Sequence, residues 1–234
     1  MRRLAFVIPT MNCLHFTRQA ITSIAVRPGD CIYVIDNGST DGTLDWLEEQ
    51  RRKGRPIVVT AFGQNLGVAA AWNRGLETAF EDGHLKALVM NNDVILAADT
   101  VDALERGYNK HLGVVSAHSV AAINALYLVE RTPTYQLPVD YSCFLLSRAV
   151  YAKVGPFDEG YWPAYFEDQD WDCRAEQLGV PRGTLGDAVT CHFHSQTLHS
   201  GQLPEHAHYF AKNQARFMEK WKDYILGGRR APGL

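Results

Sequence analysis

Leu88-Val89-Met90-Asn91-Asn92-Asp93-Val94 is a short apolar run that ends abruptly in two amides and an acid. The apolar part has the length and composition of a buried strand, and the polar residues follow at its carboxyl end. In an open α/β sheet, ligands bind in the crevice beyond the carboxyl ends of the strands. The stretch therefore predicts one strand of such a sheet, with ligand-binding groups at its end.

The residues on either side of this stretch alternate between short apolar runs and helical patterns. Strands are predicted at 4–8, 31–35, 57–61 and 87–90. Helices are predicted at 15–25, 43–53, 68–81 and 99–108. This alternation is typical of an α/β fold with a doubly wound, mostly parallel sheet and flanking helices.

The second half of the chain is less regular. Apolar runs at 125–129 and 142–146 flank a Thr-Pro-Thr loop, and an antiparallel strand added there would make the sheet mixed. Helices are predicted from Glu167 to Gly179 and over about 205–224. The aromatic residues of the last helix either pack on the same domain or form a homodimer. We expect one domain at 1–204, with the helix and tail of 205–234 packed on it.

Composition limits the functional classes. The chain has 234 residues, is 46% hydrophobic and carries a net charge of -3, so it has no overall basic field to gather nucleic acid. No apolar run approaches the ~20 residues that cross a bilayer, and the first one is too short for a signal peptide. The five cysteines are odd in number and form no CxxC pair, which argues against a disulfide framework. We expect a cytoplasmic protein without an integral membrane segment, whose contact with a membrane would be peripheral.

Polar residues also follow the other predicted strands. Asp36 ends the second strand, where a carboxylate can accept hydrogen bonds from a ribose hydroxyl or a base. Asn65 and Gly67 precede a helix whose N-terminus attracts phosphate. The loop Pro9-Thr10-Met11-Asn12 follows the first strand and could run over a base, although a plain turn is the better interpretation of that loop alone.

Asp93 and two histidines are candidate metal ligands. Asp93 can bind a divalent cation directly, with a donor diphosphate and water as its other ligands. His192 and His194 share one face of a strand, so one of them could bind the same cation. A zinc site with Cys173 or Cys191 is an alternative, but the spacing matches no usual zinc pattern.

Glu167 and Asp168 form a second acidic cluster, directly after an aromatic run at 161–166. The helix dipole favours acids at a helix start, and this explains Asp170 and Asp172 adequately. It does not explain two acids next to an aromatic wall. A carboxylate in that setting has a raised pKa and can act as a general base.

The order of these motifs resembles the family 2 glycosyltransferases of the GT-A fold, especially their bacterial rhamnosyltransferase-like branch. The resemblance covers roughly residues 4–195, and the segment around Lys212-Asn213 is similar to a helix that often follows. The motifs are the strand with Pro9-Thr10, Ile35 to Asp41, Asn65-Leu66-Gly67 to Asn73, Asn91-Asn92-Asp93, Val154 to Glu159, Phe166-Glu167-Asp168, and His192.

The resemblance implies a metal-assisted, inverting transfer of a sugar from a UDP- or dTDP-linked donor to an acceptor hydroxyl. Asp168 would be the catalytic base, and Glu167 would orient the acceptor or the base. Asp93 would be the carboxylate of a DXD-type motif whose first acid is replaced by Asn91, and His192 or His194 would complete the metal site. An imidazole ligand favours Mn²⁺ over Mg²⁺. The implied donor-binding residues are Pro9, Thr10, Asn12, Asp36, Asn65, Gly67, Asn73, Asn91 and Asn92.

Two other functions stay open. A sugar nucleotidyltransferase has a similar sheet and also needs a cation, but the loop after the first strand lacks the glycines and lysine expected there. A non-catalytic nucleotide-sugar-binding protein is the other alternative, against which Glu167 and Asp168 argue. The acceptor is not readable from the sequence: a saccharide, a lipid-linked saccharide, a small molecule, a protein and modified DNA are all candidates.

Overall fold

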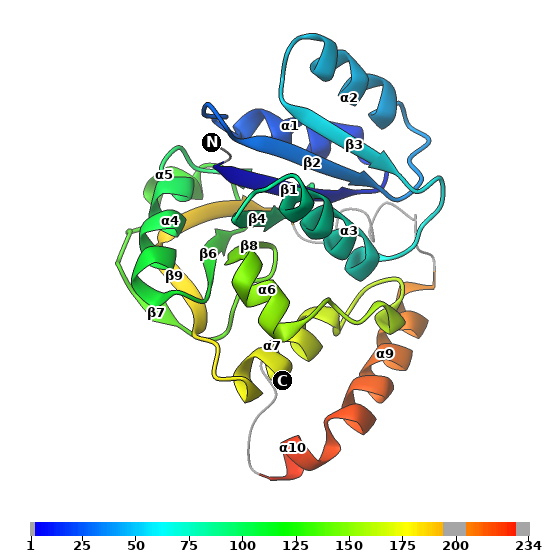
Figure 1. Ribbon diagram of the computed structural model, residues 1–234, viewed down its shortest axis with the longest axis vertical. Helices are drawn as coiled ribbons and strands as arrows, with labels where there is room; N and C mark the ends of the chain where they lie inside the picture. Colours follow the sequence, from blue (N-terminus) through cyan, green and yellow to red (C-terminus); the bar gives the residue numbers. More distant parts are fainter. Residues whose placement is uncertain (1–2, 194–204, 228–234) are drawn as a thin grey trace.

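A nine-stranded mixed sheet with helices on both faces forms the centre of the molecule (Figure 1). The computed structural model describes residues 3–193 and 205–227. Neighbouring strands follow the order β3-β2-β1-β4-β8-β6-β9-β5, and β7 pairs with β9 outside this path. The α/β fold predicted from the sequence is confirmed.

The first half of the chain builds the parallel part of this sheet. β1 (Leu4–Thr10), β2 (Cys31–Asp36), β3 (Ile57–Ala61) and β4 (Lys86–Met90) run parallel to one another. The helices between them are α1 (Leu14–Ser23), α2 (Thr43–Arg52) and α3 (Val68–Glu81). All seven elements lie where the alternating pattern predicts them. The four carboxyl ends therefore meet at one edge of the sheet.

The second half adds antiparallel strands and further helices. β8 runs antiparallel to both β4 and β6, while β6 and β9 are parallel. The elements are β5 (Val94–Leu96), α4 (Thr100–His111), β6 (Val114–Val120), α5 (Ala125–Leu128), β7 (Tyr135–Gln136), β8 (Cys143–Ser147), α6 (Arg148–Val154), the 3₁₀ turn η1 (Glu159–Tyr161), α7 (Glu167–Gln177), β9 (Arg182–His192), α9 (His206–Lys220) and α10 (Lys222–Leu226).

Two sequence interpretations of this half need correction. The apolar run at 142–146 is indeed an antiparallel strand, but the run at 125–129 is the short helix α5. A run of this length does not distinguish a strand from a helix by periodicity. The last predicted helix is also divided, because α9 ends at Lys220 and α10 begins at Lys222.

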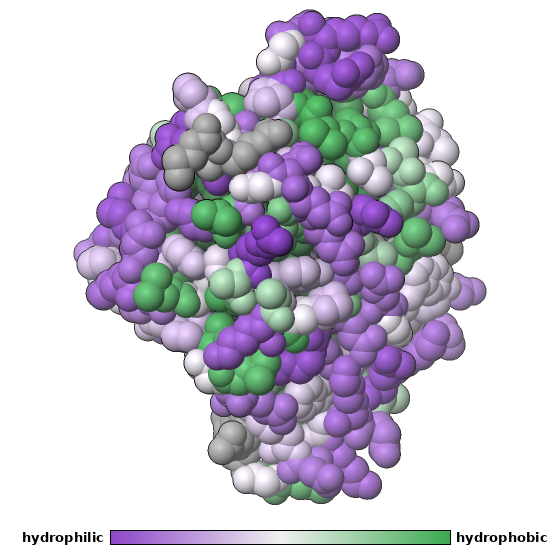
Figure 2. Space-filling model, in the orientation of Figure 1, coloured by the Kyte–Doolittle hydropathy of each residue, from purple (hydrophilic) through white to green (hydrophobic). Residues whose placement is uncertain are grey.

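Each face of the sheet has its own core. One core joins the strands to α3, α6 and α7, and the other joins them to α1, α2 and α4. A third cluster, around Phe166, Phe217 and Trp221, packs α9 against the start of α7. Hydrophilic side chains cover α2 and most of α9 on the face shown in Figure 2, with apolar side chains in separate patches between them. Among the described residues, no helix combines the length and apolar character needed to cross a membrane.

Candidate active site

A cavity of about 740 Å³ lies at the carboxyl ends of the parallel strands. One side is formed by residues at or directly after the ends of β1, β2 and β4, among them Thr10, Asn37 and Asp93. The other side is formed by the segments 138–142 and 163–169, which precede β8 and open α7. The cavity has the size of a small-molecule site and lies where open α/β sheets bind ligands.

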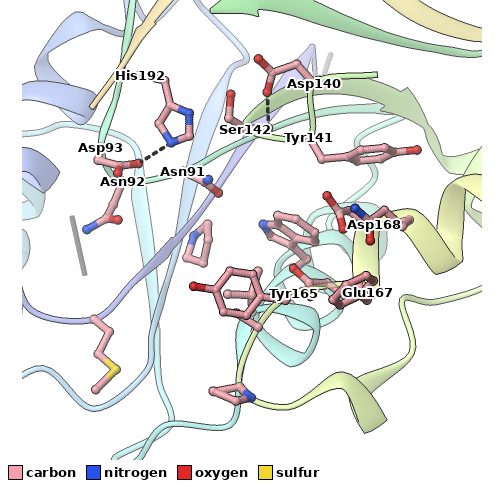
Figure 3. Close-up of a pocket in the computed structure, with 18 of the residues that line it drawn as sticks. Asn91, Asn92, Asp93, Asp140, Tyr141, Ser142, Tyr165, Glu167, Asp168 and His192 are labelled. Atoms are coloured by element: carbon pink, nitrogen blue, oxygen red, sulfur yellow. Dashed lines mark hydrogen bonds and ion pairs between the residues drawn. The ribbon is translucent and has the colours of Figure 1, made fainter. Parts of the chain in front are cut away.

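Asp93 and His192 come together on one wall of this cavity. Residues 91–93 form a tight turn after β4, and β5 then pairs with β9 so that Val94 lies opposite His192. This pairing places His192 Nε2 3.2 Å from Asp93 Oδ1 (Figure 3). Both side chains are largely buried, at 13% and 7% exposure. His194, the other predicted histidine, lies outside the described residues.

The neighbouring asparagines fix the same wall. The Asn91 backbone N–H donates to the Ser142 carbonyl (2.9 Å), which ties the turn to the start of β8. The Asn92 amide donates to the hydroxyls of Thr10 (3.3 Å) and Thr17 (3.1 Å). Both asparagines line the cavity. The turn that carries Asp93 is therefore attached to β1, α1 and β8.

The predicted donor-binding residues divide into two groups. Pro9, Thr10, Asn65, Asn91 and Asn92 line the cavity. The structure does not place Asn12, Asp36, Gly67 or Asn73 in its lining.

Asp36 and Asn12 shape the loops beside the cavity. Asp36 is fully buried, and its Oδ2 accepts hydrogen bonds from the backbone N–H groups of Gly38 and Ser39. Backbone groups of the loop thus donate some of the hydrogen bonds to Asp36 that we expected from a ligand. The next residue, Asn37, lines the cavity in its place. Asn12 Oδ1 accepts from the Thr40 backbone N–H (2.7 Å), which joins the loops after β1 and β2.

Asn73 and Gly67 contact the segment that leads to α7. The Asn73 amide bonds the backbone of Phe157 at both its N–H and its carbonyl, and it also bonds Glu159 and Tyr151. Gly67 has φ +94°, and a Cβ there would lie 3.1 Å from Trp162 Cδ1. These two residues therefore link the first half of the chain to the segment before α7.

Glu167 and Asp168 lie on the wall opposite Asp93 and His192 (Figure 3). They open α7 directly after Tyr165 and Phe166, whose φ angles of 79° and 73° turn the chain into the helix. Burial, helped by the charges of Asp172 and Asp140, raises the pKa of Asp168 to about 6, although the hydrogen bond that Asp168 accepts from the Gln169 N–H acts to lower it. Such a carboxyl group can take a proton near neutral pH.

Glu167 is more deeply buried than Asp168. Its side chain is 5% exposed, and its Oε2 has no hydrogen-bond partner among the described residues. Burial raises the pKa of Glu167 well above its usual value, and the adjacent Asp168 adds to this effect. Deeper burial of Glu167 therefore favours Asp168 as the member of the pair that ionises first.

Sequence reasoning missed several residues of the cavity. Asp140, Tyr141 and Ser142 line it from the segment before β8, and Phe210 lines it from α9. Asp140 lies before an apolar run, whereas Asp93 follows one, so the signal that identifies Asp93 does not mark Asp140. Phe210 was not detectable either, because nothing local indicates that α9 folds back to the cavity.

The cavity lining is acidic. Four carboxylates line it, those of Asp93, Asp140, Glu167 and Asp168, and the lining contains no lysine or arginine among the described residues. A bound diphosphate would therefore lack a side-chain cation from this lining. Asp93 with His192 offers an oxygen and a nitrogen ligand of the kind that binds Mn²⁺. No group of three or more His, Cys, Asp or Glu residues in the described ranges could hold a metal by itself, so a cation there would need further ligands from a bound molecule and water.

Comparison with known proteins gives a consistent result. The family model described as "Glycosyl transferase family 2" matches residues 5–155. A galactofuranosyl glycosyltransferase of Leishmania donovani is 38% identical over 79 residues, which make up 34% of this chain and 18% of that protein. The chain thus spans less than a fifth of that relative's length.

Two solved structures have a similar fold. The mannosyltransferase PcManGT from Pyrobaculum calidifontis, in complex with GDP-Man and Mn²⁺, matches with a TM-score of 0.65 and 18% identity over 99% of this chain and 66% of that chain. The Staphylococcus aureus protein TarS, residues 1–349 in complex with UDP, matches with a TM-score of 0.65 and 17% identity over 82% of this chain and 60% of that chain. At these identities the likeness concerns the fold.

Proposed function

The chain belongs to glycosyl transferase family 2, and we propose that it is an inverting, metal-assisted glycosyltransferase that moves a sugar from a nucleotide-diphosphate donor to an acceptor hydroxyl. One observation carries this proposal. Asp93 with His192, and Glu167 with Asp168, line opposite walls of one cavity. The first pair suits a cation that meets a diphosphate, and the second suits proton removal from an acceptor.

The donor would lie along the wall formed by the first half of the chain. Thr10, Asn37 and Asn65 line the cavity after β1, β2 and β3 with groups that can bond a base or a ribose. Asn37 is held in place because its Oδ1 accepts from the Leu66 N–H (3.1 Å). The bound UDP and GDP-Man of the two similar structures support a nucleotide-linked donor but do not determine which nucleotide this chain prefers.

Asp93 and His192 would hold the divalent cation. This fits the donor set, because two protein ligands at a cavity wall leave the other positions to phosphate oxygens and water. It also fits the acidic lining, which supplies no lysine or arginine for a diphosphate. When bound, a divalent cation offsets the negative charge that grows on the departing diphosphate.

Asp168 would act as the catalytic base of a single displacement. The acceptor hydroxyl gives its proton to the Asp168 carboxylate while its oxygen forms a bond to the anomeric carbon. The bond from that carbon to the diphosphate oxygen breaks, and its electron pair leaves with the nucleoside diphosphate. Attack from the wall opposite the leaving group inverts the configuration. Burial raises the pKa of Glu167, which disfavours a second full charge beside the base.

Donor binding and transfer test this proposal together. UDP-, GDP-, dTDP- and CMP-linked sugars are screened by thermal shift with and without Mn²⁺, and the donor that binds is then incubated with a saccharide array. We expect one nucleotide class to raise the melting temperature only with Mn²⁺, and its sugar to reach an acceptor with inverted configuration. Release of pyrophosphate from a sugar phosphate and a nucleoside triphosphate would favour a nucleotidyltransferase. Binding without turnover on any acceptor would favour a non-catalytic protein.

A further inference from the structure

We infer that Asn213 of α9 is a positioning residue for the catalytic base, because its amide holds the loop that aims Glu167 and Asp168 into the cavity. The inference rests on the proposed function, and it assigns α9 a part in the reaction. Asn213 lies about 45 residues after the acids along the chain, and its side chain is fully buried.

The Asn213 amide lies where four backbone carbonyls converge. Its Nδ2 is 2.9 Å from the Tyr161 carbonyl oxygen and 2.8 Å from that of Ala164. The carbonyls of Trp162 and Tyr165 lie at 3.4 Å. One NH₂ group has two protons, so the two short contacts are the main hydrogen bonds and the longer ones share them. The segment 161–165 is therefore curled around a single side-chain donor.

The Asn213 oxygen supports this orientation of the amide. Oδ1 is buried and has no hydrogen-bond partner among the described residues. Rotating the amide by half a turn would put this oxygen against carbonyl oxygens, and two short hydrogen bonds would be lost. A buried acceptor without a partner is unfavourable, so the fold retains this asparagine for the bonds that its nitrogen makes.

The loop that Asn213 holds has an unfavourable backbone conformation. Tyr165 and Phe166 are consecutive non-glycine residues with positive φ, at 79° and 73°. Residues other than glycine, asparagine and aspartate rarely adopt this region, and surrounding contacts must impose it. Glu167 and Asp168 follow directly. A loop that relaxed to ordinary angles would turn both carboxylates away from their present positions.

Other contacts from α9, and one from Trp221 directly after it, hold both ends of the same segment. Arg216 and Lys220 form ion pairs with Asp158, before the loop. Trp221 Nε1 donates to Asp170 Oδ1 (2.9 Å), and Lys220 Nζ lies 2.6 Å from the same oxygen. The segment 158–170 is thus attached to α9 at its start, middle and end. Of these contacts, only the Asn213 amide reaches the residues with positive φ.

The environment of Asp168 gives a readout that does not depend on turnover. Asp168 is faced by Glu167 and Asp172 on its own helix and by Asp140 from the segment before β8, while Arg182 of β9 is paired with Asp172. Burial among these groups holds the pKa of Asp168 at about 6. A relaxed loop would let the carboxylate reach solvent, and its pKa would fall toward the ordinary value.

The test compares Asn213→Leu with wild type, each with and without Asp168→Asn. Leucine has a similar volume and no donor. With Asn213 intact, we expect the gain in melting temperature from Asp168→Asn to grow between pH 4 and pH 6. Over this range the native Asp168 carboxyl keeps a proton that the unfolded chain has lost, which destabilises the protein with Asp168 but not the Asp168→Asn variant. In the Asn213→Leu background this pH-dependent gain should largely disappear. Transfer kcat should fall ~10–100-fold with the donor KM little changed, as for a misplaced catalytic group.

Asn73→Leu is the matched control, because Asn73 is a buried amide that bonds the backbone of Phe157, ahead of the same loop. It should lower the melting temperature and leave the Asp168 titration in place. If both leucine variants leave that titration unchanged, Asn213 is only structural and the inference is wrong. If wild type transfers no sugar, the proposed function fails while the titration still reports on the loop. Asn213→Asp should behave like Asn213→Leu above pH 7, where a carboxylate would face the carbonyls.

Discussion

The two walls of the cavity are held in place by different kinds of contact. The donor wall follows from parallel strands, whose ends meet at one edge and whose loops are joined by short-range bonds such as Asp36 to Gly38. The opposite wall depends on a loop with two positive φ angles and on a helix from the end of the chain. Binding of the donor and removal of the acceptor proton should therefore respond to different substitutions.

The sharpest separation of the two walls should come from Asp168→Asn. The variant keeps the shape of the side chain and removes the base, so we expect transfer to fall ~10³-fold or more while donor affinity stays nearly unchanged. Single-turnover kinetics and calorimetry with the donor measure the two quantities. Glu176→Gln removes a charge from the outer side of the same helix and is the control. Loss of donor affinity in Asp168→Asn would mean that this residue serves the nucleotide or the metal.

Asp93→Asn tests the donor wall in the same way. It removes the only carboxylate of the residue 91–93 turn, and the cation interaction is worth several kcal/mol, so Mn²⁺-dependent donor affinity should fall ~100-fold. Titration calorimetry at several Mn²⁺ concentrations measures this loss, and His192→Gln should show a related one. Asp45→Asn, an exposed acid on α2, is the control. Equal donor affinity with and without Mn²⁺ in wild type would argue against a metal at Asp93.

The pH dependence of transfer should depend on the wall opposite the donor, which carries Asp168, and not on the donor wall. Asp168 must be ionised to accept a proton, and its pKa is about 6. We therefore expect kcat to fall below pH 6, approaching tenfold per pH unit, and to level off above pH 7. Rates measured from pH 4.5 to pH 8 at saturating donor test this. A profile that stays flat down to pH 5 would exclude Asp168 as the base.

The sequence predicted the donor wall better than the opposite wall. The first four strands and three helices have regular apolar periodicity, and Asp93 is marked by its place after an apolar run. Glu167 and Asp168 were also recognisable, because dipole effects do not account for acids beside so many aromatic residues. These signals are local, and in a parallel sheet local signals are sufficient to place strand ends at one edge.

The rest depended on contacts between distant parts of the chain. A strand was predicted around His192, but its extent over Arg182–His192 and its pairing with β5, which is what brings His192 to Asp93, were not. Asn73 and Gly67 occupy motif positions associated with the donor, yet they contact the segment before α7. Residue type at a motif position does not reveal which element packs against it.

The contact between Gly67 and the Trp162-Pro163 segment, which joins the two walls, can be tested by substitution. Its φ of +94° suits glycine, and a Cβ would lie 3.1 Å from Trp162 Cδ1 and 3.2 Å from the Pro163 carbonyl oxygen. We expect Gly67→Ala to lower the free energy of unfolding by about 2–3 kcal/mol. Gly63→Ala is the control, with φ +72° and no atom within 4 Å of the added Cβ; strain alone should cost about 1 kcal/mol there. If chemical denaturation gives the same loss of unfolding free energy for both variants, the contact between Gly67 and Trp162-Pro163 tolerates an added methyl group.

The smallest expected effect concerns Glu167, which is 5% exposed and has a raised pKa. The native state keeps this proton after the unfolded chain has lost it, so wild-type stability should decline as pH rises above the unfolded value of about 4.3. Glutamine does not titrate. Glu167→Gln should thus gain stability relative to wild type between pH 4 and pH 8, by an amount of order 1 kcal/mol. A constant difference across this range would show that Glu167 ionises as freely in the fold as outside it. If Glu167→Gln is more stable than wild type but transfers sugar more slowly, Glu167 lowers the stability of the fold and at the same time supports the catalytic base Asp168.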